Sequence, residues 1–114
     1  MVFKEDYDEN SRLQESKKIL LKYPTRIPII VEKHEKCQFE EINKKKYLVP
    51  KDLPMNQFVF IIRKRIKLDP SQTLFIMVND SLVSSSELLG EVYETKKDED
   101  GFLYMKYSSE NTFG

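Results

Sequence analysis

The stretch from Lys44 to Pro50 joins three consecutive lysines to a short apolar segment that ends at a proline. The apolar part contains an aromatic and a β-branched residue, which favours a strand over a helix. Proline has no amide proton for a ladder, so this strand should lie at a sheet edge. An exposed edge can accept a partner peptide as an additional strand, and the lysines would favour acidic residues beside that peptide. The alternative is an ordinary edge strand with a solvated run of charges beside it.

Residues with catalytic potential are few. The chain has one cysteine, Cys37, which lies between the polar residues Lys36 and Gln38, and one histidine, His34, for which no catalytic-triad partners are visible in the sequence. We therefore predict a surface thiol at Cys37 and a solvated loop position for His34. A single cysteine cannot form an internal disulfide, which fits a cytoplasmic protein. The sequence predicts neither an enzyme nor a metal or cofactor site.

Size and charge narrow the classes of protein to which this chain could belong. The 114 residues fit one domain, and 39% hydrophobic and 33% charged residues are typical of a soluble globular protein. No apolar run approaches the roughly 20 residues that span a bilayer, and no signal-peptide pattern occurs. The net charge is zero, yet residues 26–67 are mainly basic and residues 68–114 mainly acidic. Without net basicity or aromatic stacking motifs, nucleic-acid binding is not expected.

The elements that would position the edge strand can be read from periodicity and caps. Phe3 and Tyr7 are four residues apart, which places both rings on one helical face. A second helix should begin at Asn10 or Ser11 and stop before Pro24. Residues 26–33 form the strongest predicted strand, and the polar residues 34–43 link it to the edge strand as an antiparallel hairpin.

The second half of the chain predicts a crossover helix, a buried strand, a short helix and a last strand. A helix over residues 55–66 should start after a cap at Asp52 and Pro54. Residues 74–78 should form a strand that ends in the turn Asn79-Asp80. Ser84 and Glu87 have the spacing of a capping box for the short helix, and residues 102–107 form the last strand.

This order predicts an α+β fold, namely a β-grasp (ubiquitin-like) domain with a mixed four-stranded sheet and two additional N-terminal helices. We expect residues 1–24 to form the helical extension, residues 25–108 the β-grasp core and residues 109–114 a flexible C-terminal tail.

Several long motifs, in order and at matching spacing, carry a more specific resemblance. The chain resembles the ubiquitin-like autophagy modifiers, the group that includes GABARAP and the microtubule-associated protein light chains, from about residue 10 to the end. The matching segments are Lys22-Tyr23-Pro24, residues 26–33, Lys44 to Pro50, Gln57-Phe58, residues 62–66, Phe102-Leu103-Tyr104, Tyr107-Ser108 and Phe113-Gly114.

The resemblance implies a modifier rather than an enzyme. Family members are joined through a C-terminal glycine, here Gly114, to phosphatidylethanolamine, by ubiquitin-like activating and conjugating enzymes. A cysteine protease processes and deconjugates them. A glycine has no side chain, which suits passage through a narrow active site. Two acyl chains are enough for stable membrane anchoring without a transmembrane segment. The resemblance thus implies a cytoplasmic monomer that becomes anchored on autophagosomes or related vesicles.

The resemblance also implies two pockets that bind an aromatic-x-x-aliphatic motif of cargo receptors and adaptors. Cations beside the edge strand would attract acidic residues that flank the motif. The aromatic pocket comprises Glu15, Ile19, Pro28, Lys46, Leu48 and Phe102. The aliphatic pocket comprises Tyr47, Val49, Pro50, Leu53, Phe58 and Ile61, of which Val49 and Phe58 should in part be core. The flanking cations are Lys44, Lys46 and Arg65.

Two alternatives remain open at this point. An unconjugated ubiquitin-like adaptor would use the peptide groove alone and would differ from the modifier only at Gly114. An enzyme or nucleic-acid binder based on the basic middle segment is disfavoured, because no set of nucleophile and base appears in the sequence and the groove already uses part of those cations.

Overall fold

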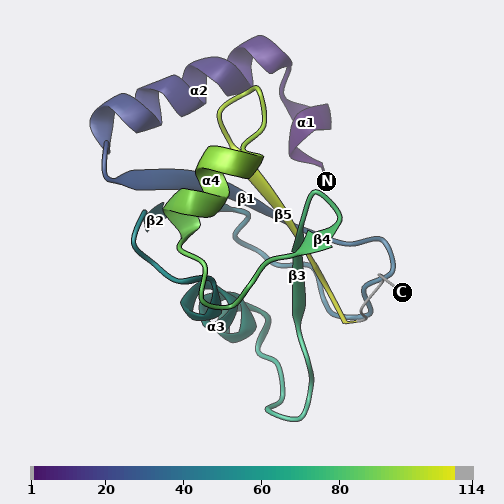
Figure 1. Cartoon of the computed structure of the whole chain (residues 1–114). Coiled ribbons are helices and arrows are strands. Elements are labelled where there is room, and N and C mark those ends of the chain that lie inside the picture. The colour runs from purple at the N-terminus through teal and green to yellow at the C-terminus, as the bar shows by residue number, and fades with distance from the viewer. Residues whose placement is uncertain (1, 110–114) are drawn as a thin grey trace.

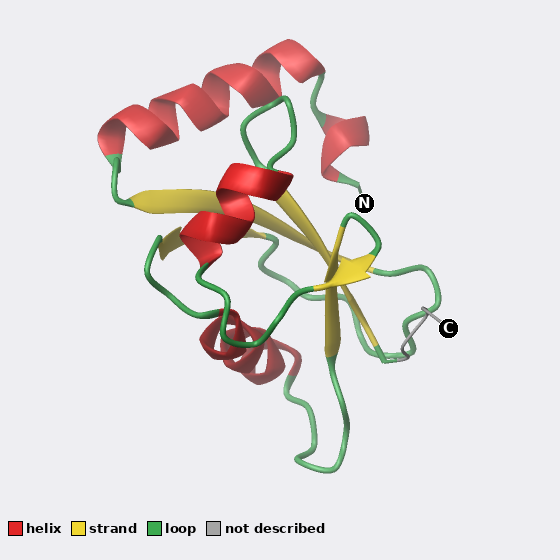
Figure 2. Ribbon diagram, in the orientation of Figure 1, coloured by secondary structure: helices red, strands yellow, loops and turns green. Residues whose placement is uncertain are grey.

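A mixed β-sheet forms the centre of the molecule, and helices cover both of its faces (Figure 1). The computed structural model describes residues 2–109 of the chain. Figure 2 shows the same view with helices and strands distinguished by colour. The elements in chain order are α1 (Phe3–Asp6), α2 (Glu9–Lys22), β1 (Arg26–Lys33), β2 (Lys46–Pro50), α3 (Met55–Ile66), β3 (Phe75–Val78), β4 (Ser81–Leu82), α4 (Leu89–Lys96) and β5 (Leu103–Ser108).

The strand order is β2-β1-β5-β3-β4. Strands β1 and β2 form the predicted antiparallel hairpin, whereas β1 and β5 are parallel. Strand β3 pairs antiparallel with β5 on one side and with β4 on the other. This is the predicted β-grasp arrangement with two N-terminal helices, and β2 lies at an edge as expected.

The sheet has five strands in residues 2–109 rather than the predicted four. Asn79 and Asp80 form the predicted turn with positive φ angles of 51° and 60°. Positive φ at both central residues is the geometry of a tight hairpin turn, so the chain returns to pair Met77 with Leu82 and Val78 with Ser81. A two-residue return strand is too short to produce a periodic pattern, which is why the sequence predicted only a turn.

Three predicted helix starts are corrected by the structure. Helix α2 is capped by Asp8, whose carboxylate accepts a hydrogen bond from the Ser11 amide at 2.8 Å, rather than by Asn10 or Ser11. Helix α3 begins after Pro54 without any side-chain cap, so Asp52 is not its cap. Helix α4 begins at Leu89, beyond the expected capping box of Ser84 and Glu87.

The starts of α3 and α4 instead cap one another through the backbone. The amides of Met55 and Asn56 donate to carbonyls of residues 87 and 85 at 2.8 and 2.9 Å. In return, the amides of Leu89 and Gly90 donate to the carbonyls of Leu53 and Lys51 at 2.9 and 2.8 Å. The amides that begin each helix are satisfied by the segment that precedes the other helix.

The core lies on both faces of the sheet because β1 is buried on both. Side chains of Ile27, Ile29 and Val31 join α3 and α4 in the larger cluster. Ile30 faces the other way and packs with Phe3 and Phe102. Cys37 is only 8% exposed and belongs to the larger cluster, so the predicted surface thiol is wrong. The prediction failed because its neighbours Lys36 and Gln38 are polar and indicated an exposed loop, whereas the loop turns the side chain of Cys37 into the core.

Helix α1 is attached to the sheet by several contacts. The Phe3 amide donates to the Glu32 carboxylate at 2.8 Å, and the ring of Phe3 packs edge-on against Phe102 at 5.1 Å. Lys4 pairs with Asp98 at 2.6 Å. Burial opposes ionisation of Asp98, but the hydrogen bonds from Lys4 and Asp100 and the positive charge of Lys4 together outweigh it and lower the pKa of Asp98. Helix α1 therefore lies beside Lys46 and Phe102, two residues of the predicted aromatic pocket.

Candidate peptide-binding groove

Strand β2 presents two different faces beside its open edge. Alternation along the strand leaves Lys46 exposed and Leu48 half-buried on the α2 side, and buries Tyr47 and Val49 on the α3 side. One edge of β2 pairs with β1, and no strand pairs with the other edge within residues 2–109. Because successive side chains alternate, a peptide added at this edge would meet chemically different surfaces on its two sides.

The predicted aromatic pocket is brought together between α2, β2 and the start of β5. Lys46 Nζ lies 2.5 Å from the Glu15 carboxylate, so an ion pair joins β2 to α2. Pro28 is buried and pairs in register with Leu48. Ile19 is half-buried and packs in the same cluster as Phe102, which is 1% exposed.

Lys46 also has aromatic neighbours on the N-terminal segment. Its ammonium group lies 5.4 Å from the ring centroid of Phe3 and 5.8 Å from that of Tyr7. These distances permit cation–π attraction. Lys46 therefore lies near α1, α2 and the link between them, and an incoming aromatic side chain would rearrange several contacts at once.

The predicted aliphatic pocket divides into core residues and accessible residues. Tyr47 and Phe58 pack edge-on with ring centroids 5.6 Å apart, and both are buried together with Val49. The expectation that Val49 and Phe58 belong partly to the core is consistent with this burial, and Tyr47 joins them. The accessible surface comes from Pro50, from half-buried Leu53 and from Ile61, which is 37% exposed.

The hydroxyl of Tyr47 is buried and has no hydrogen-bond partner among the described residues. Burial raises the pKa of Tyr47, and the positive charge of Arg65 partly opposes this effect. The ammonium group of Lys44 lies 5.1 Å from the centroid of the Tyr47 ring. The three predicted flanking cations, Lys44, Lys46 and Arg65, are exposed.

Two polar features near the groove were not predicted. The guanidinium of Arg26 donates to the Leu48 carbonyl at 3.3 Å, beside the open edge. Arg12 pairs at 2.6 Å with Asp100, which is fully buried and also accepts a hydrogen bond from the Tyr104 hydroxyl. Burial and the hydrogen bond to Asp100 raise the pKa of Tyr104. Asp100 lies in the mainly acidic part of the sequence, between Glu99 and Gly101, so only its partners in the fold reveal this role.

The conjugation residue predicted from the sequence, Gly114, lies outside the described residues. Among residues 2–109, no group of three or more histidine, cysteine, aspartate or glutamate side chains is placed to hold a metal ion. No helix formed by this part of the chain combines the length and apolar character needed to cross a membrane.

Comparison with known proteins identifies the family. The sequence profile described as "Autophagy protein Atg8 ubiquitin like" matches residues 11–114. The chain belongs to the Atg8 family. It is 57% identical over 113 residues to Autophagy-related protein 8e of Arabidopsis thaliana, covering 99% of this chain and 93% of the relative. It is 52% identical over 112 residues to Autophagy-related protein 8 of Candida glabrata, covering 98% and 95%.

Solved structures of Atg8 proteins share this fold. Trypanosoma brucei ATG8 superposes with a TM-score of 0.92 at 42% identity, covering 100% of this chain and 98% of that one. Plasmodium falciparum Atg8, solved in complex with a Plasmodium falciparum Atg3 peptide, gives 0.89 at 35% identity, covering 96% and 97%. The resemblance inferred from the sequence motifs is confirmed, and this chain is an autophagy-related ubiquitin-like protein of the Atg8 family.

Proposed function

We propose that this Atg8-family protein is conjugated through Gly114 to phosphatidylethanolamine and then recruits partners that carry an aromatic-x-x-aliphatic motif. It would thereby tag autophagosomes or related vesicles and bring cargo receptors and autophagy machinery to them. The observation that carries the recruitment part is the open edge of β2, with Lys46 and Leu48 facing α2 on one side and Pro50, Leu53 and Ile61 accessible on the other.

Binding would proceed by strand addition. The motif backbone would pair with the outer edge of β2, which would require the Arg26 guanidinium to share or release the Leu48 carbonyl. The aromatic residue would insert between α2 and β2 after Lys46 moves away from Glu15. The aliphatic residue would rest on Leu53 and Ile61. Acidic residues before the motif would meet Lys44 and the displaced Lys46.

The proposed partners follow from the family. The structural relative from Plasmodium falciparum is bound to an Atg3 peptide, which supports a conjugating enzyme as one partner of the present chain. Activating enzymes and a processing or deconjugating cysteine protease would act on the C-terminal tail. The chain itself would serve as their substrate.

Two sets of substitutions separate conjugation from peptide binding. Gly114→Ala should abolish the phosphatidylethanolamine adduct, detected by intact-mass analysis of the protein from a membrane fraction of its own cells, and leave binding of a motif peptide intact. Lys46→Ala combined with Leu48→Ala should weaken peptide affinity by about tenfold or more and leave the adduct unchanged.

The same measurements decide between a conjugated modifier and an unconjugated adaptor. An unmodified mass in cells with active conjugating enzymes would favour the unconjugated adaptor. Equal loss of both activities in either variant would contradict separate sites.

A further inference from the structure

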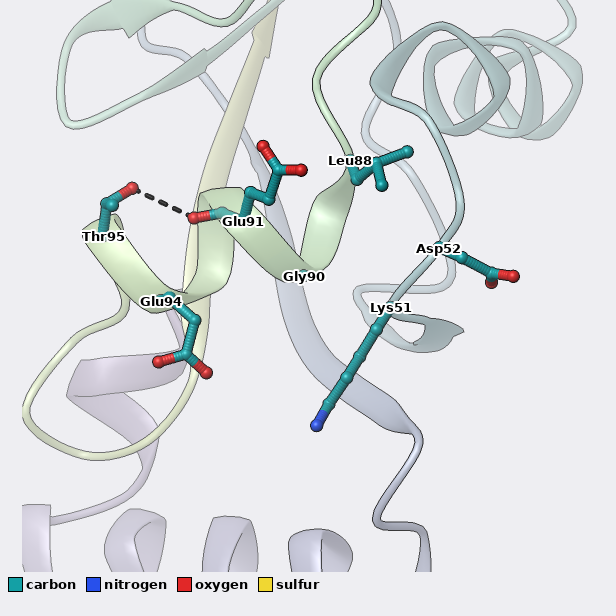
Figure 3. A pocket seen from close by; sticks show the side chains of 7 residues that line it. All are labelled: Lys51, Asp52, Leu88, Gly90, Glu91, Glu94 and Thr95. Carbon is teal, nitrogen blue, oxygen red and sulfur yellow. Dashed lines mark hydrogen bonds between the residues drawn. The ribbon is translucent and has the colours of Figure 1, made fainter.

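A pocket of about 540 Å³ opens between α4 and the segment that follows β2 (Figure 3). It is separate from both motif pockets, and its lining residues are Lys51, Asp52, Leu88, Gly90, Glu91, Glu94 and Thr95. We refer to it as the α4 pocket. Its size falls within the range of ordinary ligand sites.

Gly90 shapes the α4 pocket. Its amide donates to the Lys51 carbonyl at 2.8 Å, so α4 approaches the segment after β2 closely. A Cβ at position 90 would lie 3.0 Å from both the Cβ and the carbonyl oxygen of Lys51. The hydrogen bond from Gly90 to Lys51 and the reciprocal capping of α3 and α4 hold the two walls of the pocket together.

The lining combines apolar surface with an excess of negative charge. Leu88, the backbone of Gly90 and the alkyl stem of Lys51 supply carbon surface. Figure 3 shows Glu91 and Glu94 projecting from α4, whereas the carboxylate of Asp52, on the facing segment, points away from the helix. Within residues 2–109, Asp52 and Glu91 make no ion pair, and Glu94 has only Lys97 at 3.8 Å. The ammonium of Lys51 is the one positive charge among these lining residues.

The α4 pocket is continuous with the end of the peptide groove. A smaller depression is lined by Pro24, Thr25, Pro50, Lys51 and Asp52. It shares Pro50 with the aliphatic pocket, and it shares Lys51 and Asp52 with the α4 pocket. Along β2 the aromatic pocket uses positions 46 and 48, whereas the aliphatic pocket continues to positions 50 and 53. A peptide running in this direction would leave the groove towards Lys51.

We propose that the α4 pocket receives a lysine or arginine side chain from the partner segment that follows the aliphatic residue of the motif. This inference rests on the proposed motif binding. Such a side chain has an alkyl stem, which suits Leu88 and Gly90, and a cationic head, which suits Glu91 and Glu94. The groove is basic around Lys44 and Lys46, so the preferred partner carries acidic residues before the motif and a basic residue after it.

Peptides that differ at one position test this assignment. Each contains an aromatic-x-x-aliphatic motif, a glycine-serine spacer of one to five residues and a final arginine, glutamine or glutamate. With the full chain at low ionic strength, we expect the arginine peptide at its best spacer length to bind about two- to fivefold more tightly than the glutamine peptide. The glutamate peptide should bind more weakly than both, and added salt should reduce these differences.

Two variants test whether the preference for the arginine peptide arises in the α4 pocket. Glu91→Gln combined with Glu94→Gln removes two pocket charges, and Thr95→Lys places a competing cation on exposed helix surface beside them. Both should remove the preference for arginine and leave the affinity for the glutamine peptide nearly unchanged. Glu35→Gln combined with Glu99→Gln is the matched control, because it changes net charge equally at exposed positions outside the pocket and should retain the preference.

The outcomes separate this inference from the proposed function. If the motif peptide without an extension does not bind, the groove itself is wrongly assigned and the inference fails with it. Equal affinities for the arginine, glutamine and glutamate peptides would overturn the α4 pocket assignment while motif binding stands. An arginine preference that survives in the Glu91/Glu94 variant would place the cation elsewhere and overturn it as well.

Discussion

Gly101 lies against the side chain of Ser16, a close contact that could not be predicted from either residue in the sequence. Gly101 has a φ of 89°, a region that favours glycine. A Cβ at Gly101 would overlap Ser16 Oγ and lie 2.9 Å from Ser16 Cβ. The Ser16 hydroxyl is buried and donates to the Asp100 carbonyl at 2.5 Å. This contact fixes α2 beside the loop that leads to β5, and α2 carries Glu15 and Ile19 of the aromatic pocket.

Gly101→Ala should lower the free energy of unfolding by more than about 1 kcal/mol, because it combines an unfavourable φ with an overlap at Ser16. Chemical denaturation of the single variants and of the Gly101→Ala, Ser16→Gly double variant separates the loss of stability caused by the backbone angle from the loss caused by the overlap with Ser16. Removal of the Ser16 side chain should relieve the overlap and leave the backbone part. Additive effects in this double-mutant cycle would show that the overlap does not matter.

The family resemblance grouped the residues of the proposed groove but did not reveal their polar neighbours. It implied that Lys46 and Leu48 belong with Glu15 and Pro28, and the structure brings these four residues close together. Asp100 was not predicted as a buried carboxylate, because a charge in an acidic run looks solvated until Arg12 and Tyr104 are brought to it by folding.

Tyr107 anchors the connection between β1 and β2 to the last strand. Its hydroxyl donates to the Glu40 carbonyl at 2.7 Å and accepts a hydrogen bond from the Ile42 amide at 2.8 Å. The ring is fully buried, and burial raises the pKa of its hydroxyl to about 12. This interaction holds the polar connection in place before the chain enters β2.

Tyr107→Phe should lower the free energy of unfolding by about 1–3 kcal/mol, because the buried Ile42 amide loses its partner. A raised tyrosine pKa also contributes stability that is fully present below the ordinary value of 10.0 and is lost as pH rises towards about 12. The difference in stability between the wild type and the variant should therefore shrink over that range. Denaturation at a series of alkaline pH values measures it, and a difference that stays constant with pH would contradict this linkage.

Helix positions were predicted better than helix starts. The apolar spacing of α3 predicted residues 55–66, and the structure has Met55–Ile66. The start of α4 was misplaced because the amides of Leu89 and Gly90 are capped by backbone carbonyls of residues 53 and 51. Side-chain capping signals are local, whereas these caps depend on two segments meeting through folding.

Each of the two helical layers has a packing role in the core and also carries residues of one proposed motif pocket. The larger core lies between the sheet and the α3–α4 layer, and it contains Tyr47, Val49 and Phe58 of the predicted aliphatic pocket. The smaller cluster lies under α1 and α2, and it contains Phe102 and Ile19 of the aromatic pocket. Both proposed motif pockets would thus be built on core side chains, with only part of each residue set accessible to a partner.

Alanine substitutions on α3 should separate these two roles. Phe58→Ala removes a fully buried ring and should lower the free energy of unfolding by about 3–5 kcal/mol. Ile61, three residues along the same helix, is 37% exposed, so Ile61→Ala should change stability by less than about 1 kcal/mol and still weaken motif-peptide binding. Denaturant midpoints and peptide titration of both variants provide the comparison. Loss of stability in Ile61→Ala equal to that in Phe58→Ala would mean that Ile61 belongs to the core, and unchanged peptide affinity would remove it from the aliphatic pocket.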